Sequence, residues 1–153
     1  MALAAPLASA RLIALDTSTF IYLIEKHPAF FGTVEPIFTE VDAGTVKAVT
    51  SVLTLLEVLV KPIETGATAL ADDFRATVTV SANLRVVDVD RAIAERAAEI
   101  RAGYGFRTPD AIHLATAQMA GADAFITNDE RLRRFPEVAV VTLGMLLGSS
   151  SGM

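Results

Sequence analysis

The chain has 153 residues, of which 52% are hydrophobic and 20% are charged, and it is long and apolar enough for one domain with a sizeable core. Its net charge of −5 excludes a general nucleic-acid coating protein, because such proteins neutralise phosphates with Lys and Arg. The lack of cysteine excludes disulfides, thiolate metal sites and a cysteine nucleophile.

Short apolar runs alternate along the chain with segments whose apolar residues recur at helical spacing. Gly44 and Pro62 are expected to end two of the helices. In chain order we predict a strand over 11–16, helices over 17–27 and 33–43, a strand over 46–51, helices over 52–61 and 67–80, a strand over 84–89, helices over 90–105 and 108–122, a strand over 124–127, one or two helical turns over 128–135 and a strand over 138–143.

The order of these elements indicates the fold class. Strands that are continuous apolar runs and alternate with helices are typical of a parallel sheet covered on both faces. We therefore predict a single three-layer α/β/α domain with a mostly parallel, about five-stranded sheet over residues 11–147. A loose leader is expected over 1–10, and a flexible tail over 148–153.

The hydropathy of the chain bears on its location. No uncharged run approaches the roughly 18–20 apolar residues that span a membrane, and the first residues lack the basic region of a signal peptide. We therefore expect a cytoplasmic protein without a membrane partner. The hydrophobic surplus is consistent with an apolar surface that another protein covers.

Two acidic residues follow predicted strands directly. Asp16 closes the first strand, and Asp129 follows the strand over 124–127. Ligands of an open parallel sheet bind beyond the carboxyl ends of its strands, so both carboxylates are candidate site residues. Each also has a structural interpretation: Asp16 as the cap of the next helix, and Asp129 as part of a capping box between Thr127 and Glu130.

Two further acids lie on predicted helices. Asp110 stands in the first turn after Pro109, where Thr108 is the expected N-cap and a carboxylate complements the helix dipole. Glu57 is the only charged residue between Lys47 and Lys61. A buried, unpaired carboxylate is costly, so Glu57 is expected to bind a metal or to pair, for instance with Lys61.

Four carboxylates at one edge of a sheet would repel one another unless cations were bound. Two Mg²⁺ or Mn²⁺ ions would balance four ionised acids, and oxygen-only ligands suit these cations. The reaction that this arrangement favours is hydrolysis of a phosphodiester by a metal-activated water.

Four stretches carry a resemblance to a known family: DTSTFIYLIE, SVLTLLEVLVKP, TPDAIHLATA and FITNDERLRRF. In this order they resemble the acidic motifs of the PIN domain, and more narrowly those of VapC-type toxins from type II toxin–antitoxin modules, over residues 12–144. The family's metal ligands map to Asp16, Glu57, Asp110 and Asp129. Its small polar site residues, which support the metal ligands or contact the substrate, map to Thr17, Ser18, Thr127 and Asn128.

The resemblance implies a five-stranded parallel sheet and Mg²⁺- or Mn²⁺-dependent endoribonuclease activity with one or two ions. It also implies a homodimer and inhibition by a small cognate antitoxin, whose peptide would lie, by analogy, on the helices over 17–27 and 52–61. The alternative is a PIN-like scaffold that binds RNA or a protein without cutting. The chain has neither GxGxxG after its first strand nor a P-loop motif, so nucleotide binding of those kinds is unsupported.

The remaining candidates are basic. His113, three residues after Asp110, is interpreted as packing or supporting the site rather than as a ligand. Arginines near the acidic motifs are the candidates for binding RNA phosphates, although Arg134 is also spaced to pair with Glu130. These candidates are Arg107, Arg131, Arg133 and Arg134.

Overall fold

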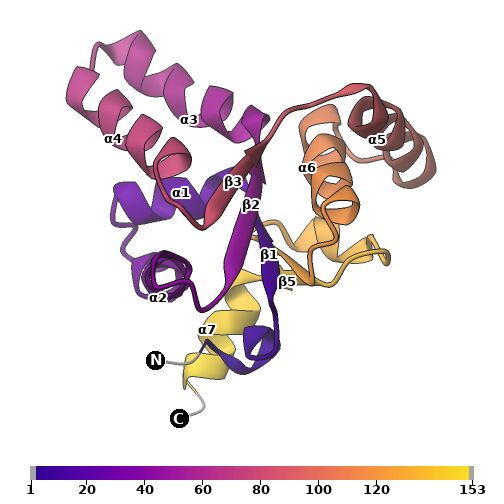
Figure 1. Cartoon of the computed structure of the whole chain (residues 1–153), viewed down its shortest axis with the longest axis horizontal. Coiled ribbons are helices and arrows are strands. Elements are labelled where there is room, and N and C mark those ends of the chain that lie inside the picture. The colour runs from indigo at the N-terminus through magenta and orange to yellow at the C-terminus, as the bar shows by residue number, and fades with distance from the viewer. Residues whose placement is uncertain (1–2, 152–153) are drawn as a thin grey trace.

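The computed structural model of the protein describes residues 3–151 and is shown in Figure 1. Its strands are β1 (Leu12–Leu15), β2 (Lys47–Ser51), β3 (Leu84–Val87), β4 (Ala124–Thr127) and β5 (Val140–Thr142). Its helices are α1 (Thr17–Ile24), α2 (Phe31–Asp42), α3 (Val52–Thr65), α4 (Thr68–Thr79), α5 (Arg91–Tyr104), α6 (Thr108–Met119) and α7 (Leu143–Ser151), with short 3-10 helices η1 (Ala5–Leu7) and η2 (Glu130–Arg134).

The five strands form one sheet in the order β3-β2-β1-β4-β5, and every neighbouring pair is parallel. Ala14 at the centre of β1 is in register with Val49 of β2 on one side and Phe125 of β4 on the other. The predicted α/β class and the sheet of about five strands are confirmed, and the sheet is parallel throughout.

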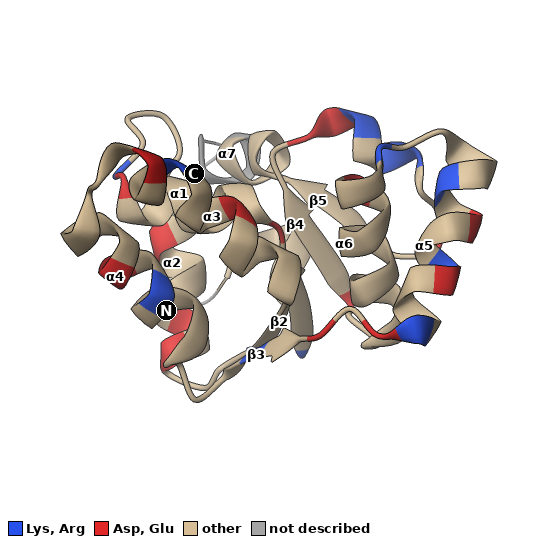
Figure 2. Cartoon of the chain, turned by 90° about the horizontal axis from the view of Figure 1, so that it is seen from above, with Lys and Arg blue, Asp and Glu red and all other residues tan. Residues whose placement is uncertain are grey.

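Helices cover both faces of the sheet, as Figures 1 and 2 show. Successive side chains of a strand point to opposite faces, so the apolar strands have side chains to bury on both. Ile13 and Leu15 of β1 pack into a core with α1, α2, α4 and α7. Ala14, between them, packs into a second core with α5 and α6. Burial on both sides explains why the strands read as continuous apolar runs.

Pro62 does not end its helix, contrary to the sequence prediction. It lies buried inside α3, which continues to Thr65. Proline removes a single helical N–H, and near the end of a helix packing compensates for that loss. The helix ends instead at Gly66, whose φ of 70° is the left-handed conformation that glycine adopts at low cost.

The N-terminal segment differs from the expected loose leader. Within residues 3–10, η1 forms a short turn, Leu7 is buried in the core, and α7 packs against this segment. Helix α7 also continues to Ser151, across most of the predicted tail, whereas residues 152–153 lie outside those described. No helix between residues 3 and 151 combines the length and apolar character needed to cross a membrane.

The sheet order places a crevice beside β1. The chain leaves β1 toward β2 on one side, whereas β4 pairs with β1 on the other. A reversal of this kind is where parallel sheets bind ligands, beyond the carboxyl ends of the two strands. Asp16 directly follows β1, and Thr127 is the last residue of β4. The fold therefore brings the first and last acidic motifs together.

Candidate active site

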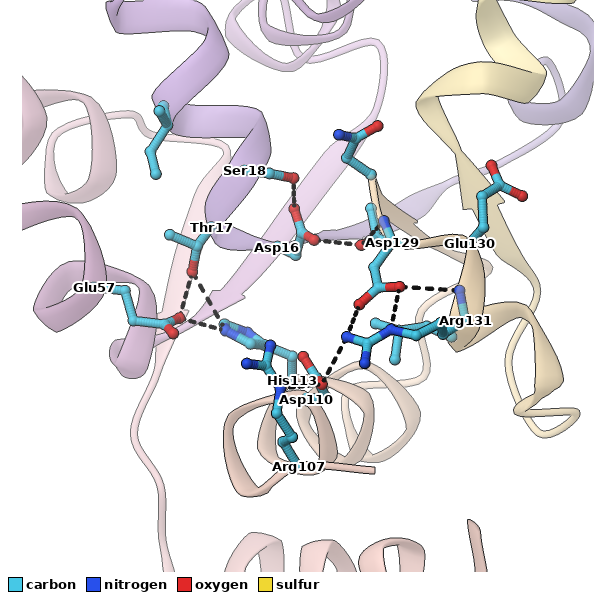
Figure 3. A pocket seen from close by; sticks show the side chains of 14 residues that line it. Asp16, Thr17, Ser18, Glu57, Arg107, Asp110, His113, Asp129, Glu130 and Arg131 are labelled. Carbon is cyan, nitrogen blue, oxygen red and sulfur yellow. Dashed lines mark hydrogen bonds and ion pairs between the residues drawn. The ribbon is translucent and has the colours of Figure 1, made fainter. Parts of the chain in front are cut away.

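An open pocket of about 460 Å³ lies at this edge of the sheet, and all four predicted acids line it. They come from four segments: the end of β1, the middle of α3, the first turn of α6 and the loop after β4. The four predicted small polar residues, Thr17, Ser18, Thr127 and Asn128, line the same pocket. Figure 3 shows Thr17 and Ser18 beside Glu57 and Asp16.

Asp16 lies half-buried in the pocket and interacts with hydroxyl groups. Ser18 Oγ donates to its Oδ1 at 2.6 Å, and Thr127 Oγ1 donates to its Oδ2. Burial raises the pKa of Asp16 above its usual value, and the two hydroxyl donors only partly oppose this effect. Asp16 is the N-cap residue of α1, in line with its structural interpretation, but its side chain forms no capping hydrogen bond.

Glu57 pairs with residues far away in sequence. Thr17 Oγ1 donates to Glu57 Oε1 at 2.6 Å, and the buried His113 places Nε2 2.9 Å from the same oxygen. Burial raises the pKa of Glu57, but the hydrogen bonds from His113 and Thr17 outweigh it and lower the pKa overall. The alternative pair with Lys61 is not formed, and His113 supports a site residue as expected.

Asp110 and Asp129 share one guanidinium, as Figure 3 shows. Arg131 donates from Nε to Asp129 Oδ1 at 3.0 Å and from Nη2 to Asp129 Oδ2 at 2.5 Å. The same Nη2 lies 3.8 Å from Asp110 Oδ2, which Arg107 Nε approaches to 3.4 Å from the other side. The hydrogen bonds from Arg131 hold the pKa of Asp129 below its usual value.

The four candidate arginines separate into two pairs. Arg107 and Arg131 line the pocket. Arg133 and Arg134 do not line it: Arg133 pairs at 3.3 Å with Glu130, which belongs to the pocket lining, and Arg134 lies over the Phe106 ring at 4.4 Å. The expected pairing of Arg134 with Glu130 is therefore wrong, because a tight 3-10 turn brings residues three apart together rather than four.

Both predicted helix caps also differ. Arg107, not Thr108, is the N-cap residue of α6, so Asp110 stands one position farther from the helix start. The Thr127–Glu130 capping box does not form. Asp129 caps η2 by accepting from the Arg131 backbone N–H, while Thr127 turns its hydroxyl to Asp16. For Thr127, a long-range contact thus competes with local capping.

Sequence reasoning did not find the hydroxyls beneath the site. Thr50 at the end of β2 bonds to the carbonyl of Leu15 and to Thr54 of α3, and both threonines are buried. The Thr17 hydroxyl oxygen lies 3.4 Å from that of Thr54. Threonines four residues apart in an otherwise apolar run were the available signal. They join the end of β1 to α3 and so help to place Asp16 relative to Glu57.

The donor chemistry of the pocket suits a hard divalent cation, since its charged ligands are carboxylates and the raised pKa of Asp16 reports an acid without a full counter-charge. Between residues 3 and 151, however, no three acidic or histidine side chains are already gathered around one point. Arg131 holds two of the acids instead. Binding of an ion by all four would require these side chains to exchange partners.

The chain was compared with known proteins. A family model described as PIN domain matches residues 13–138, whereas no curated protein matches significantly. A toxin–antitoxin complex from Klebsiella pneumoniae is 24% identical, with 86% of this chain and 97% of that chain covered and a TM-score of 0.64. DNA-bound VapBC from Salmonella typhimurium is 21% identical, with 87% of this chain and 98% of that chain covered and a TM-score of 0.62.

A third solved structure is the sarcin–ricin loop cleaving toxin VapC20 from Mycobacterium tuberculosis. It is 22% identical, with 74% of this chain and 86% of that chain covered and a TM-score of 0.61. At these identities the structures share the fold. The family model spans most of the chain and includes the positions of all four pocket acids. The chain therefore belongs to the PIN domain family.

Proposed function

We propose that this protein is a Mg²⁺- or Mn²⁺-dependent endoribonuclease that acts as the toxin of a toxin–antitoxin pair. One observation carries the proposal: four carboxylates from distant segments line one open pocket, and Asp16 is desolvated there. Within residues 3–151, no Lys or Arg pairs with Asp16. A buried carboxylate without a basic partner favours a bound metal over a purely structural role.

Asp16, Glu57, Asp110 and Asp129 would hold one or two ions. When bound, a divalent ion supplies an activated water and neutralises the charge that develops on the phosphodiester. The chain's own residues orient the ligands: the Ser18 and Thr127 hydroxyls fix Asp16. Thr17 and His113 hold Glu57 in the same way.

Substrate binding by an acidic protein requires local positive charge. Arg107 is largely exposed at the rim of the pocket, with 70% of its side chain accessible, and makes only a long contact with Asp110. We assign it to the RNA backbone. Asn128 lines the pocket but donates to the Tyr22 hydroxyl at 2.8 Å, which fits a role in holding the loop after β4.

The partner proposal rests on surface and similarity together. Two of the similar solved structures are complexes of a toxin with its antitoxin. On α3 of this chain, Leu56, Val60 and Ile63 are exposed and lie on one helical face. We propose that a small cognate antitoxin covers this stripe together with α1, and that the protein forms a homodimer in the cytoplasm.

The test is RNA cleavage by purified protein in Mn²⁺ or Mg²⁺ against EDTA, with Asp110→Asn prepared identically. We expect metal-dependent cleavage that disappears in the variant, because the amide cannot supply the charge of the ligand. Equal cleavage by both proteins would indicate a contaminating ribonuclease or a wrong site. Lack of cleavage on a broad panel of structured RNAs, including tRNA, would favour the non-cleaving scaffold.

A further inference from the structure

The guanidinium of Arg131 occupies a position that the proposed function reserves for a cation. It forms a two-point contact with Asp129 and lies 3.8 Å from Asp110. Both acids are expected metal ligands, so the +1 charge of Arg131 balances part of their −2 when no ion is bound. We propose that Arg131 is a built-in competitor for the metal, which must leave Asp110 and Asp129 before these carboxylates can bind an ion.

The hydrogen bonds of Asp129 show which of its oxygens this exchange would free. Oδ1 accepts from the Arg131 backbone N–H at 3.0 Å as well as from Nε. The backbone bond keeps Oδ1 in place after the side chain departs. Oδ2 accepts only from Nη2 among the bonds between described residues, so it becomes available. Departure of Arg131 therefore exposes a carboxylate oxygen without releasing the loop.

Arg131 can move because little structure holds it. Its side chain is 63% exposed, in contrast to 14% for Asp110 and 27% for Asp129. The residue sits in the short η2, whose packing depends on the buried Leu132 rather than on the arginine. The two acids are thus largely buried, whereas the arginine side chain lies mostly in solvent and is held chiefly by the acids themselves. Metal binding would displace a side chain rather than reshape the fold.

The prediction concerns metal affinity and does not require activity. Removing Arg131 abolishes the competition, so Mn²⁺ should bind Arg131→Ala with a Kd about two- to fivefold lower, in line with the strength of exposed ion pairs. Arg131→Lys keeps the charge but loses the two-point contact, so its Kd for Mn²⁺ should lie between those of Arg131→Ala and the unaltered protein. Isothermal titration of the full chain with Mn²⁺ alone, without RNA, measures these constants.

Arg133→Ala is the matched control. It removes the same charge from the same 3-10 helix, but Arg133 pairs with Glu130, which points away from the other acids (Figure 3). Its Mn²⁺ affinity should stay close to that of the unaltered protein. A general effect of net charge would instead tighten binding equally in Arg133→Ala and Arg131→Ala, and that result would overturn the proposal.

Other outcomes are equally decisive. Unchanged or weaker Mn²⁺ binding by Arg131→Ala, in a sample whose circular dichroism and melting show a folded protein, would refute competition and make Arg131 a supporting group. The proposal rests on the proposed metal site. If neither the unaltered protein nor any variant binds Mn²⁺, both fail, whereas equal binding by all of them removes only the role of Arg131.

Discussion

Replacement of Thr127 by Val tests how the chain holds its buried acid. Thr127 is fully buried, its hydroxyl donates to Asp16, and its oxygen accepts from the Asp129 N–H at 3.0 Å. Val has nearly the same shape but lacks both functions. A hydrogen bond to a charged group contributes about 1.5–3 kcal/mol, so the free energy of unfolding should fall by roughly 2–3 kcal/mol at neutral pH. For a chain of this length the Tm falls by about 5–10 °C.

The control is Thr127→Ser, which keeps the hydroxyl and loses one buried methyl group, at a cost of about 1 kcal/mol. The two variants differ further in pH dependence. Loss of the donor raises the already raised pKa of Asp16, so the Val penalty is full at high pH and shrinks as the pH falls through that pKa. The Ser penalty should not change. Urea titrations across this range in EDTA measure both.

If Thr127→Val is no less stable than Thr127→Ser, or if its penalty does not change with pH, the hydroxyl does not stabilise an ionised Asp16. Burial would then raise the pKa of Asp16 without opposition from this hydrogen bond, and the assignment of Thr127 as the residue that orients the carboxylate would be wrong.

Two more predictions concern the metal-free and metal-bound protein. Because the pKa of Asp16 is raised in the folded state, its contribution to stability is present below the unfolded pKa and is lost as the pH rises. In EDTA, Asp16→Asn should therefore have a higher Tm than the unaltered protein at neutral pH and the same Tm at acidic pH. A lower Tm of the variant at neutral pH would contradict this. Mn²⁺ at about 100 times its Kd should stabilise the unaltered protein by about 2.7 kcal/mol, which is measured as a rise in Tm relative to EDTA. Asp129→Asn should lose most of this rise in Tm. If Mn²⁺ does not raise the Tm of the unaltered protein, the result argues against a metal site.

The sequence predicted those features that depend on periodicity and on the ends of strands. Apolar runs located all five strands, and their regular alternation with helices predicted a parallel sheet. Because parallel strands end at one edge, the order of the elements placed the acids after β1 and β4 at the same edge of the sheet. That these two strands are neighbours is known from the structure. Glu57 was found because a lone charge in an apolar helix is costly to bury without a partner.

Rules based on neighbours in sequence could not predict hydrogen-bond partners that depend on tertiary packing. Glu57 lies 56 residues from His113, and its pairing depends on how α3 and α6 approach the sheet. The capping box predicted at Thr127 failed for the same reason, since a capping motif describes only neighbours in sequence and the Thr127 hydroxyl donates to Asp16. Pro62 was misjudged because the rule for proline ignores the packing that supports the last turn of α3.

The four acids are stabilised by separate sets of donors. Hydroxyl groups stabilise Asp16. Thr17 and His113 hold Glu57, and Arg131 bridges Asp110 and Asp129. In the proposed metal site, binding an ion would exchange these partners for the metal, and the net affinity would be the difference between the two sets of interactions. The donors beside the carboxylates would then control metal occupancy as much as the carboxylates themselves.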